Sequence, residues 1–306
     1  MLAPSPITFT GNPLDRASER RGDGAWLAEA WEDPTALAVA MWDGRPLVED
    51  AGAGLQIAYV QASLARAASP DEGRHAFLGL WKDTPVFAVD FEGSIDPSSG
   101  PLMGLGRFED LRAAAARLPA ADAGLCATAK GVFEWARRCR HCSICGQALV
   151  PADGGWKRLC AACGAEHFPR TDPVAIMLAV HGEQCLLGRQ SRFPKGMWSA
   201  LAGFIEPGES IEEACARELN EEAGLNATSV AYRFSQPWPY PASLMIGLIA
   251  EVDSLEATPD QTELEAVRWF SRAEARALLA GEVEGAFAPP PLAIAHHLLR
   301  VWAEEA

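Results

Sequence analysis

The chain has 306 residues, of which 49% are hydrophobic, and its formal net charge is −15 at pH 7. This length predicts two domains, or three if one is small, and the apolar content is enough to build their cores. The acidic balance argues against broad nucleic-acid binding, which depends on lysine and arginine, but not against a phosphate ligand bridged by a metal ion.

The N-terminal sequence predicts no targeting signal. It lacks a basic stretch followed by an apolar core, and no apolar run in the chain reaches the ~18 residues of a membrane span. We therefore expect a cytoplasmic protein with no membrane partner. Only residues 1–23 have the composition of a disordered segment.

Residues 1–125 are predicted to form an N-terminal α+β domain. Its strand-like segments lie at 36–40, 56–61, 77–81 and 85–89, and helical, Ala-rich segments follow at 111–118 and 127–138. Gly104-Leu-Gly106 is similar to part of a dinucleotide-binding fingerprint, but the third glycine is missing and no strand–turn–helix unit surrounds it. We therefore assign no nucleotide site here, see no internal repeat, and expect scaffolding or dimerisation as the domain's role.

Residues 126–168 are predicted to hold a helix and a zinc ribbon. Two Cys-x2-Cys pairs lie 14 residues apart, and their members are Cys142, Cys145, Cys160 and Cys163. Thiolates at this spacing can share one tetrahedral, structural Zn²⁺. Gly146 and Gly164 follow the pairs, where a tight turn needs glycine. Cys139 is taken as a spare, and the nearby basic residues form either a solvated surface or a modest phosphate-facing patch.

Residues 169–306 are predicted to form a mixed sheet between helices, an α/β/α sandwich. The expected strands lie at 174–180, 185–188, 230–234, 244–252 and 267–270. Ser210 and Ser271 each precede a glutamate by three residues, a pattern typical of a capped helix start. A last helix is expected at 291–302.

The stretch 203–225 contains seven Glu and one Arg, yet its apolar residues keep a helical spacing. At about 100° per residue, Glu218 and Glu222 fall on the same inward face as Cys215, with Glu221 at the edge of that face. Carboxylates that continue an apolar stripe need a compensating charge. A divalent cation is the simplest partner, and oxygen ligands suit Mg²⁺ or Mn²⁺, which usually bind together with phosphate.

Residues 235–245, SQPWPYPASLM, alternate three prolines with Trp238 and Tyr240. Because each proline fixes φ and removes a backbone donor, this segment cannot be an interior strand. We expect a stiff loop that presents its aromatic rings to a base or a pyridine ring. The alternative is a connector that packs both rings into a core.

The acidic stretch resembles the Nudix box, with Gly203, five residues, Glu209, seven residues, and then the run from Arg217 to Leu225. A zinc ribbon upstream of such a box, and a Ser-Gln-Pro-Trp-Pro-aromatic-Pro-x-Ser segment after it, are similar to the NADH pyrophosphatase family. The resemblance covers residues 130–305, whereas the first ~125 residues fit only in length and general character. It implies that the N-terminal domain 1–125 is itself Nudix-like. It implies the Nudix fold, and hydrolysis of NAD(H) to nicotinamide mononucleotide and AMP.

The resemblance also implies site residues. Catalysis would involve Arg217, Glu218, Glu221, Glu222 and Glu263. The four glutamates and the backbone carbonyl of Ala202 would hold two or three Mg²⁺ or Mn²⁺, and Glu221 or Glu263 would be the general base. Substrate contacts are implied for Phe168, where the family usually has tyrosine, and for Gln236, Pro237, Trp238, Pro239, Tyr240, Pro241, Ala242, Ser243 and Ala295.

Three alternatives of function stay open. The main role could be removal of NAD caps from the 5′ ends of RNA, with the basic residues of the ribbon contacting the RNA. The substrate could instead be ADP-ribose or a dinucleoside polyphosphate. The chain could also be a non-catalytic nucleotide sensor, although its complete box argues against this. A homodimer is a further implication of the resemblance.

Overall fold

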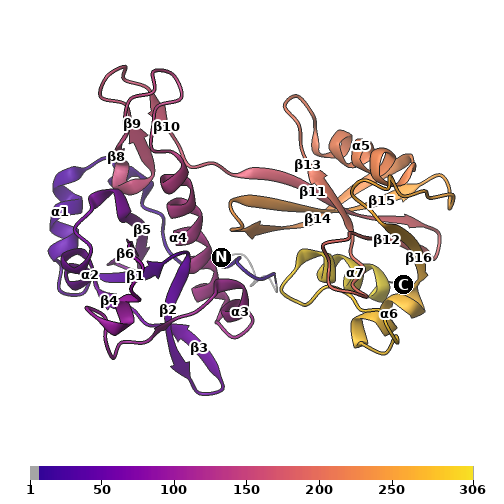
Figure 1. The fold of residues 1–306 in the computed structure, drawn as a ribbon, viewed down its shortest axis with the longest axis horizontal. Coiled ribbons are helices and arrows are strands. Elements are labelled where there is room, and N and C mark those ends of the chain that lie inside the picture. The colour runs from indigo at the N-terminus through magenta and orange to yellow at the C-terminus, as the bar shows by residue number, and fades with distance from the viewer. Residues whose placement is uncertain (1–6, 306) are drawn as a thin grey trace. The chain divides into compact units, whose positions relative to one another are not determined.

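The computed structural model describes residues 7–305, so residues 1–6 and Ala306 are outside the description (Figure 1). The chain divides into two compact units. The first comprises residues 1–171 and 238–242, and the second comprises residues 172–237 and 243–306. Part of the segment expected to be disordered lies outside the described residues. The rest includes buried residues, since Ile7 and Phe9 are each only 2% exposed.

The first unit is built on a mixed sheet with the strand order β3-β2-β1-β6-β5, in which β4 also pairs with β1 and β7 with β2. Its strands are β1 (Leu37–Trp42), β2 (Arg45–Ala51), β3 (Gly54–Ile57), β4 (Val60–Gln61), β5 (His75–Trp81), β6 (Thr84–Phe91) and β7 (Arg107–Phe108). Its helices are η1 (Ser18–Arg20), α1 (Gly24–Glu32), α2 (Ala62–Ala68), η2 (Glu72–Arg74), η3 (Pro97–Ser99), α3 (Leu111–Ala115) and α4 (Ala120–Arg138).

Two sequence-based boundaries in this unit were wrong. The strand expected at 56–61 is two strands, β3 and β4, and the helix expected from residue 127 begins at Ala120. The extension is an apolar face, because Ala123, Leu125 and Cys126 are all buried. The first half of α4 is rich in alanine and glycine, so its sequence shows little of the periodic alternation of apolar and polar residues that predicts a helix.

The ribbon follows α4 within the same unit and forms a small antiparallel sheet of its own, with the order β10-β9-β8. Its elements are β8 (Val150–Ala152), η4 (Asp153–Gly155), β9 (Lys157–Leu159) and β10 (Glu166–His167). The turn η4 lies against the outer strand β5, since Trp156 Nε1 donates to Phe77 O at 2.6 Å. The ribbon is therefore anchored on the sheet of the first unit.

The second unit has a sheet with the order β14-β15-β11-β12-β16, and β13 also pairs with β11. Its strands are β11 (Asp172–His181), β12 (Gln184–Arg189), β13 (Leu201–Phe204), β14 (Ala227–Trp238), β15 (Ser243–Val252) and β16 (Ala266–Ser271), and its helices are α5 (Ile211–Ala223), α6 (Arg272–Ala280) and α7 (Ile294–Glu304). Alternate residues of β11 serve two cores. Ile176 and Leu178 pack in the core that contains α6 and α7, whereas Met177 and Ala179 pack in the core that contains α5. The predicted α/β/α sandwich is confirmed.

The proline-rich segment differs from its prediction. Residues 235–238 continue β14, and only residues 239–242 form the turn into β15. Proline has no backbone N–H to donate to a neighbouring strand. Pro237 is tolerated in β14 because β14 is the outer strand of its sheet and has a neighbouring strand on one side only. The exclusion of an interior strand was correct, but the loop is shorter than expected.

The two units repeat one arrangement of strands, a repeat that the sequence did not reveal. In the first, β1 pairs in parallel with β6 and antiparallel with β2 and β4; in the second, β11 pairs in parallel with β15 and antiparallel with β12 and β13. A helix follows the short strand in each case, α2 after β4 and α5 after β13. The sequence of α2, ASLARAA, has no carboxylate, so this helix has no counterpart of Glu218 and Glu222. Among the described residues, no helix has the length and apolar character to cross a membrane.

Candidate active site

Helix α5 begins and ends where its sequence predicts. Ser210 Oγ accepts from the Glu213 N–H at 3.2 Å, and Glu213 Oε2 accepts from the Ser210 N–H at 2.7 Å, which completes a capping box. Gly224 ends the helix with a left-handed φ of 68°. The predicted inward face is confirmed by burial. Cys215 is fully buried and Glu222 is 3% exposed, whereas Glu221 lies at the exposed edge.

Glu222 is a buried carboxylate with no hydrogen-bond partner for either oxygen in the described part of the chain. Burial raises the pKa of Glu222 to about 8, and the charges of Glu218, Glu263 and Asp260 add to the effect. The backbone of Ala202, on β13, lowers this pKa in part, but its N–H is not in hydrogen-bonding geometry with the carboxylate. An unpaired charge in such a position is costly unless a cation compensates it.

Glu218 lies against the backbone of β13 at Gly203. A Cβ placed on Gly203 would stand 1.8 Å from Glu218 Cδ, so no residue with a side chain fits there while Glu218 keeps its place. Burial raises the pKa of Glu218 as well, although Arg217 opposes this. Position 203 must therefore be glycine for the Glu218 carboxylate of α5 to keep its place.

Arg217 connects the loop before α5 with the acidic helix. Its Nε and Nη2 donate to the two oxygens of Glu209 at 2.5 and 2.8 Å, and Nη1 donates to Glu218 at 2.7 Å and to Glu221 at 2.9 Å. Nη2 also donates to Phe204 O at 3.0 Å. This pairing holds the pKa of Glu209 at about 2. Arg217 thereby fixes the loop and orients the carboxylates.

Residues 258–264 bring a second acidic segment to the end of α5. The Asp260 N–H donates to Glu222 O at 3.1 Å, and the Thr258 N–H donates to Ala223 O at 2.9 Å. Asp260 in turn accepts from Thr262 Oγ1 and from the backbone N–H of Leu264, which lowers the pKa of Asp260 to about 2. Glu263 is exposed, and its charge acts on Glu222. Sequence reasoning missed Asp260; the Asp-x-Thr turn motif before Glu263 was the available signal.

The residues of this acidic cluster fit a divalent cation. The cluster consists of Glu218, Glu222, Asp260 and Glu263. The charges of Glu218, Glu263 and Asp260 act on Glu222, and the two oxygens of Glu222 have no hydrogen-bond partner in the described residues. Carboxylate oxygens beside a backbone strand are the donor type that Mg²⁺ and Mn²⁺ prefer. Glu221 belongs to the edge of the cluster through Arg217.

The cysteine cluster fits zinc. Ligand atoms of Cys142, Cys145, Cys160 and Cys163 all lie within 4.8 Å of one another. Cys139 is not part of the group, as predicted. Gly146 and Gly164 have φ of 75° and 74°, and their N–H groups donate to Cys142 O and Cys160 O at 2.9 and 2.8 Å. Two matching knuckles of this kind close a structural Zn²⁺ site.

The predicted substrate residues fall into both units, and each is placed by its own neighbours. Gln236 is fully buried; its Nε2 donates to Leu292 O at 2.8 Å and its Oε1 accepts from the Ile294 N–H at 2.9 Å, so it holds the start of α7. Ala295 is 4% exposed in the same core, and Ser243 begins β15. Phe168, in the first unit, is 60% exposed. Their contact with a substrate stays a prediction.

Trp238 and the turn after it group with the first unit. The rings of Trp238 and Tyr240 lie 6.1 and 6.2 Å from the ring of Phe9, both edge-on. Arg112 Cζ lies 4.5 Å from the centroid of Tyr240. These rings are packed, which is the alternative that the sequence left open, and stacking of a substrate on them stays a prediction, as do contacts with Pro237, Pro239, Pro241 and Ala242.

Sequence profiles of three known domains match consecutive parts of the chain. The NADH pyrophosphatase-like rudimentary NUDIX domain matches residues 35–135, and the NADH pyrophosphatase zinc ribbon domain matches residues 137–168. The NUDIX domain matches residues 169–288. The rudimentary domain is the unit whose helix α2 lacks carboxylates.

Several curated proteins are similar over most of the chain. A protein named NAD-capped RNA hydrolase from Homo sapiens is 35% identical over 96% of this chain and 72% of its own length. A Schizosaccharomyces pombe protein named NAD-capped RNA hydrolase is 34% identical over 98% of this chain and 93% of its own length. A human mitochondrial NAD(P)H pyrophosphatase is 42% identical over 65% of this chain and 60% of its own length.

Proposed function

Because the chain belongs to the NADH pyrophosphatase family of Nudix hydrolases, we propose that it hydrolyses the pyrophosphate bond of NAD(H) to nicotinamide mononucleotide and AMP. The observation that carries the proposal is Glu222, a buried carboxylate without a hydrogen-bond partner in the described chain, beside three further carboxylates. Such a group is tolerated where a cation compensates it.

Glu218, Glu222 and their acidic neighbours would hold two or three Mg²⁺ or Mn²⁺, with the carbonyl of Ala202 as a further ligand. When bound, these ions neutralise phosphate oxygens and lower the pKa of an attacking water. Arg217 holds Glu218 and Glu221 in position and ties them to the loop that carries Glu209. The protein's part in phosphoryl chemistry of this kind is mainly positioning and charge.

Two carboxylates are candidates for the general base. Glu221 accepts from Arg217 at 2.9 Å, whereas no hydrogen bond or ion pair of the Glu263 side chain is found in the described residues. Glu263 is therefore the freer of the two to accept a proton from water, and we propose it as the base. Comparing the pH dependence of kcat in Glu263→Gln and Glu221→Gln tests this. Loss of the acidic limb only in Glu221→Gln would reverse the assignment.

A second candidate function is removal of NAD caps from RNA, which breaks the same bond. It is favoured by the names of the human and fission-yeast relatives, which match nearly the whole chain. The net charge of −15 argues for a small RNA contact, such as the basic residues of the ribbon. A homodimer and a cytoplasmic location are further proposals drawn from the sequence.

Initial rates on NADH, NAD⁺, ADP-ribose and NAD-capped RNA, each with Mg²⁺ or Mn²⁺, test the proposal. We expect cleavage of NADH into two mononucleotides, and a loss of at least about a hundredfold in Glu222→Gln. Salt should weaken only the RNA reaction if the ribbon contacts RNA. A Glu222→Gln variant that turns over NADH as fast as the parent would refute the catalytic assignment, and turnover of ADP-ribose alone would refute the substrate.

A further inference from the structure

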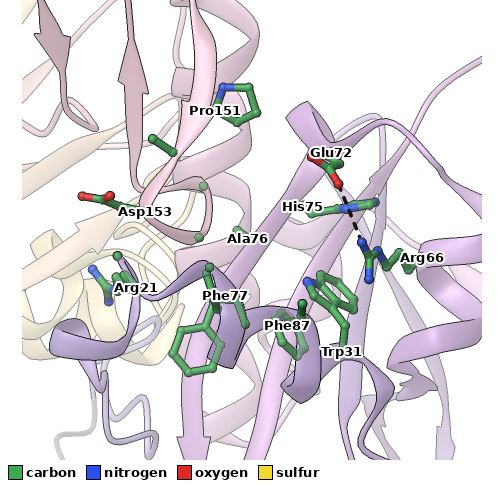
Figure 2. Close-up of a pocket in the computed structure, with 17 residues that line it drawn as sticks. Arg21, Trp31, Arg66, Glu72, His75, Ala76, Phe77, Phe87, Pro151 and Asp153 are labelled. Atoms are coloured by element: carbon green, nitrogen blue, oxygen red, sulfur yellow. Dashed lines mark ion pairs between the residues drawn. The ribbon is translucent and has the colours of Figure 1, made fainter.

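A pocket of about 330 Å³ opens on the first unit, between α1, the outer strand β5 and the ribbon turn η4 (Figure 2). Its volume is at the lower end of the range typical of small-molecule sites, about 300–1,000 Å³. Every residue that lines it belongs to the first unit, so it is formed without the acidic cluster of α5. Nothing in the proposed reaction uses it.

Aromatic rings line one side of the pocket; Trp31 is 8% exposed, and Phe77 and Phe87 are almost fully buried. Trp31 stacks on Phe87 with centroids 3.7 Å apart, and Phe77 lies 5.4 Å from Phe87. His75 lies 5.2 Å from Trp31, and its Nε2 is 2.6 Å from Ser69 O; burial lowers the pKa of His75, which keeps the ring neutral. A neutral lining of rings suits stacking by a planar heteroaromatic group.

Arg21 places a cation at one end of that aromatic lining (Figure 2), where burial lowers its pKa and the charges of Asp153 and Glu19 partly offset this effect. Its guanidinium lies 3.9 Å from the centroid of Trp156, and its Nε is buried with no hydrogen-bond partner among the described residues. The carboxylate on that side of the pocket, Asp153, is paired with Lys157 at 3.0 Å. A guanidinium in this state has donors available for a phosphate.

The opposite end offers both a donor and an acceptor. Arg66 Nη2 and Glu72 Oε1 lie 3.6 Å apart there (Figure 2), too far for a hydrogen bond. Arg66 Nη1 lies at the same distance, 3.6 Å, from Glu32 Oε1. Arg66 Cζ is 5.6 Å from the centroid of Trp31. A loosely paired guanidinium and carboxylate can meet the polar edge of a nucleobase, which carries donors and acceptors side by side.

We propose that this pocket is a second nucleotide site, which binds a nucleoside monophosphate with its base against Trp31 and its phosphate on Arg21. The volume fits one nucleotide rather than a dinucleotide. The unit repeats the strand arrangement of the catalytic unit without the carboxylates of its helix, so it binds without hydrolysing. This binding does not depend on the proposed activity, because it is measured without turnover.

Calorimetric titration of the full chain with AMP and with adenosine tests the site. Divalent cations are left out, so that the carboxylates of the acidic cluster repel phosphate. AMP should bind at least about tenfold more tightly than adenosine, and Arg21→Gln should abolish that difference. Arg45→Gln is the matched control, since Arg45 also stacks on a tryptophan, Trp42, at 5.7 Å, and lies outside the pocket.

A blocking variant provides independent evidence. Ala28 lines the pocket from α1, whereas Ala25 on the same helix does not, and both are exposed. Ala28→Phe should prevent AMP binding, and Ala25→Phe should leave it unchanged, with circular dichroism confirming that both fold. Equal affinities for AMP and adenosine in the parent, or AMP binding that survives both Arg21→Gln and Ala28→Phe, would overturn the proposal.

Discussion

The carboxylate of Glu218 occupies the space that a side chain at position 203 would need. A Cβ on Gly203 would lie 1.8 Å from Cδ of Glu218 and about as close to both carboxylate oxygens, at 1.9 and 2.1 Å. The glycine therefore lets strand β13 and the Glu218 carboxylate of helix α5 approach closely. This contact explains why the acidic pattern of the helix starts with a glycine on the preceding strand.

Gly203→Ala should displace Glu218 without unfolding the protein. The methyl group cannot coexist with the carboxylate, and a side chain that is partly exposed can move away more readily than the sheet can. We expect kcat on NADH to fall by about a hundredfold, as misplacement of a catalytic group by about 1 Å commonly costs. Gly131→Ala, at a helical glycine with nothing within 4 Å, is the control and should retain full activity. Full activity of Gly203→Ala would show that Glu218 is dispensable.

Glu222→Gln should stabilise the protein when divalent cations are absent, and increasingly so at higher pH. The pKa of Glu222 is about 8 in the folded chain and near its ordinary value of 4.5 when unfolded, so folding binds a proton between these values. The contribution of Glu222 to the free energy of unfolding of the parent is fully present below pH ~4.5. It is lost as the pH rises towards 8, which lowers the free energy of unfolding by an amount on the order of a few kcal/mol. Gln carries no charge, so the variant lacks this loss.

Thermal melts of both proteins at pH 5 and pH 8.5 in Mg²⁺-free buffer measure the effect. The gap between their melting temperatures should widen with pH, and added Mg²⁺ should narrow it by stabilising the parent alone. A gap that is the same at both pH values and with Mg²⁺ would mean that Glu222 neither titrates in this range nor binds the ion.

Arg217→Lys should keep the positive charge but lose most of the hydrogen bonds that the guanidinium donates. The guanidinium donates to both oxygens of Glu209 and to Glu218, Glu221 and Phe204 O, and one ammonium group cannot reach all of them. We expect kcat to fall about tenfold to a hundredfold, and half-activation by Mg²⁺ to require a higher concentration. Arg233→Lys, at a single ion pair with Glu305 in the same unit, serves for comparison and should change neither quantity.

Cys163→Ser should remove zinc from the ribbon, whereas Cys139→Ser should not. Cys163 belongs to the group whose sulfur atoms converge, and Cys139 lies outside it. Metal analysis should give about one zinc per chain for the parent and for Cys139→Ser, and close to none for Cys163→Ser, with a lowered melting temperature. Zinc loss in Cys139→Ser would indicate that the ligand register begins at Cys139 instead.

The acidic helix was predictable because its information is local. Capping by Ser210 and the stop at Gly224 depend on residues within one turn, and the burial of Glu222 follows from helical phase with Cys215. The cysteine pairs were predictable for the same reason. Asp260 was not, because its proximity to Glu222 depends on a hydrogen bond between its N–H and the end of α5, across 38 residues of sequence.

By itself, the sequence determined the acidic helix, the zinc ligands and the family, since all three depend on residue type at fixed short spacing. The tertiary structure decided which residues distant in the sequence come into contact. It placed Gly203 against Glu218, packed the rings of Trp238 and Tyr240 on Phe9, and showed that α2 stands where α5 stands in the other unit. It also formed the pocket beside Trp31. These features arise from strand pairing and side-chain packing between distant segments, which leave no periodic trace in the chain.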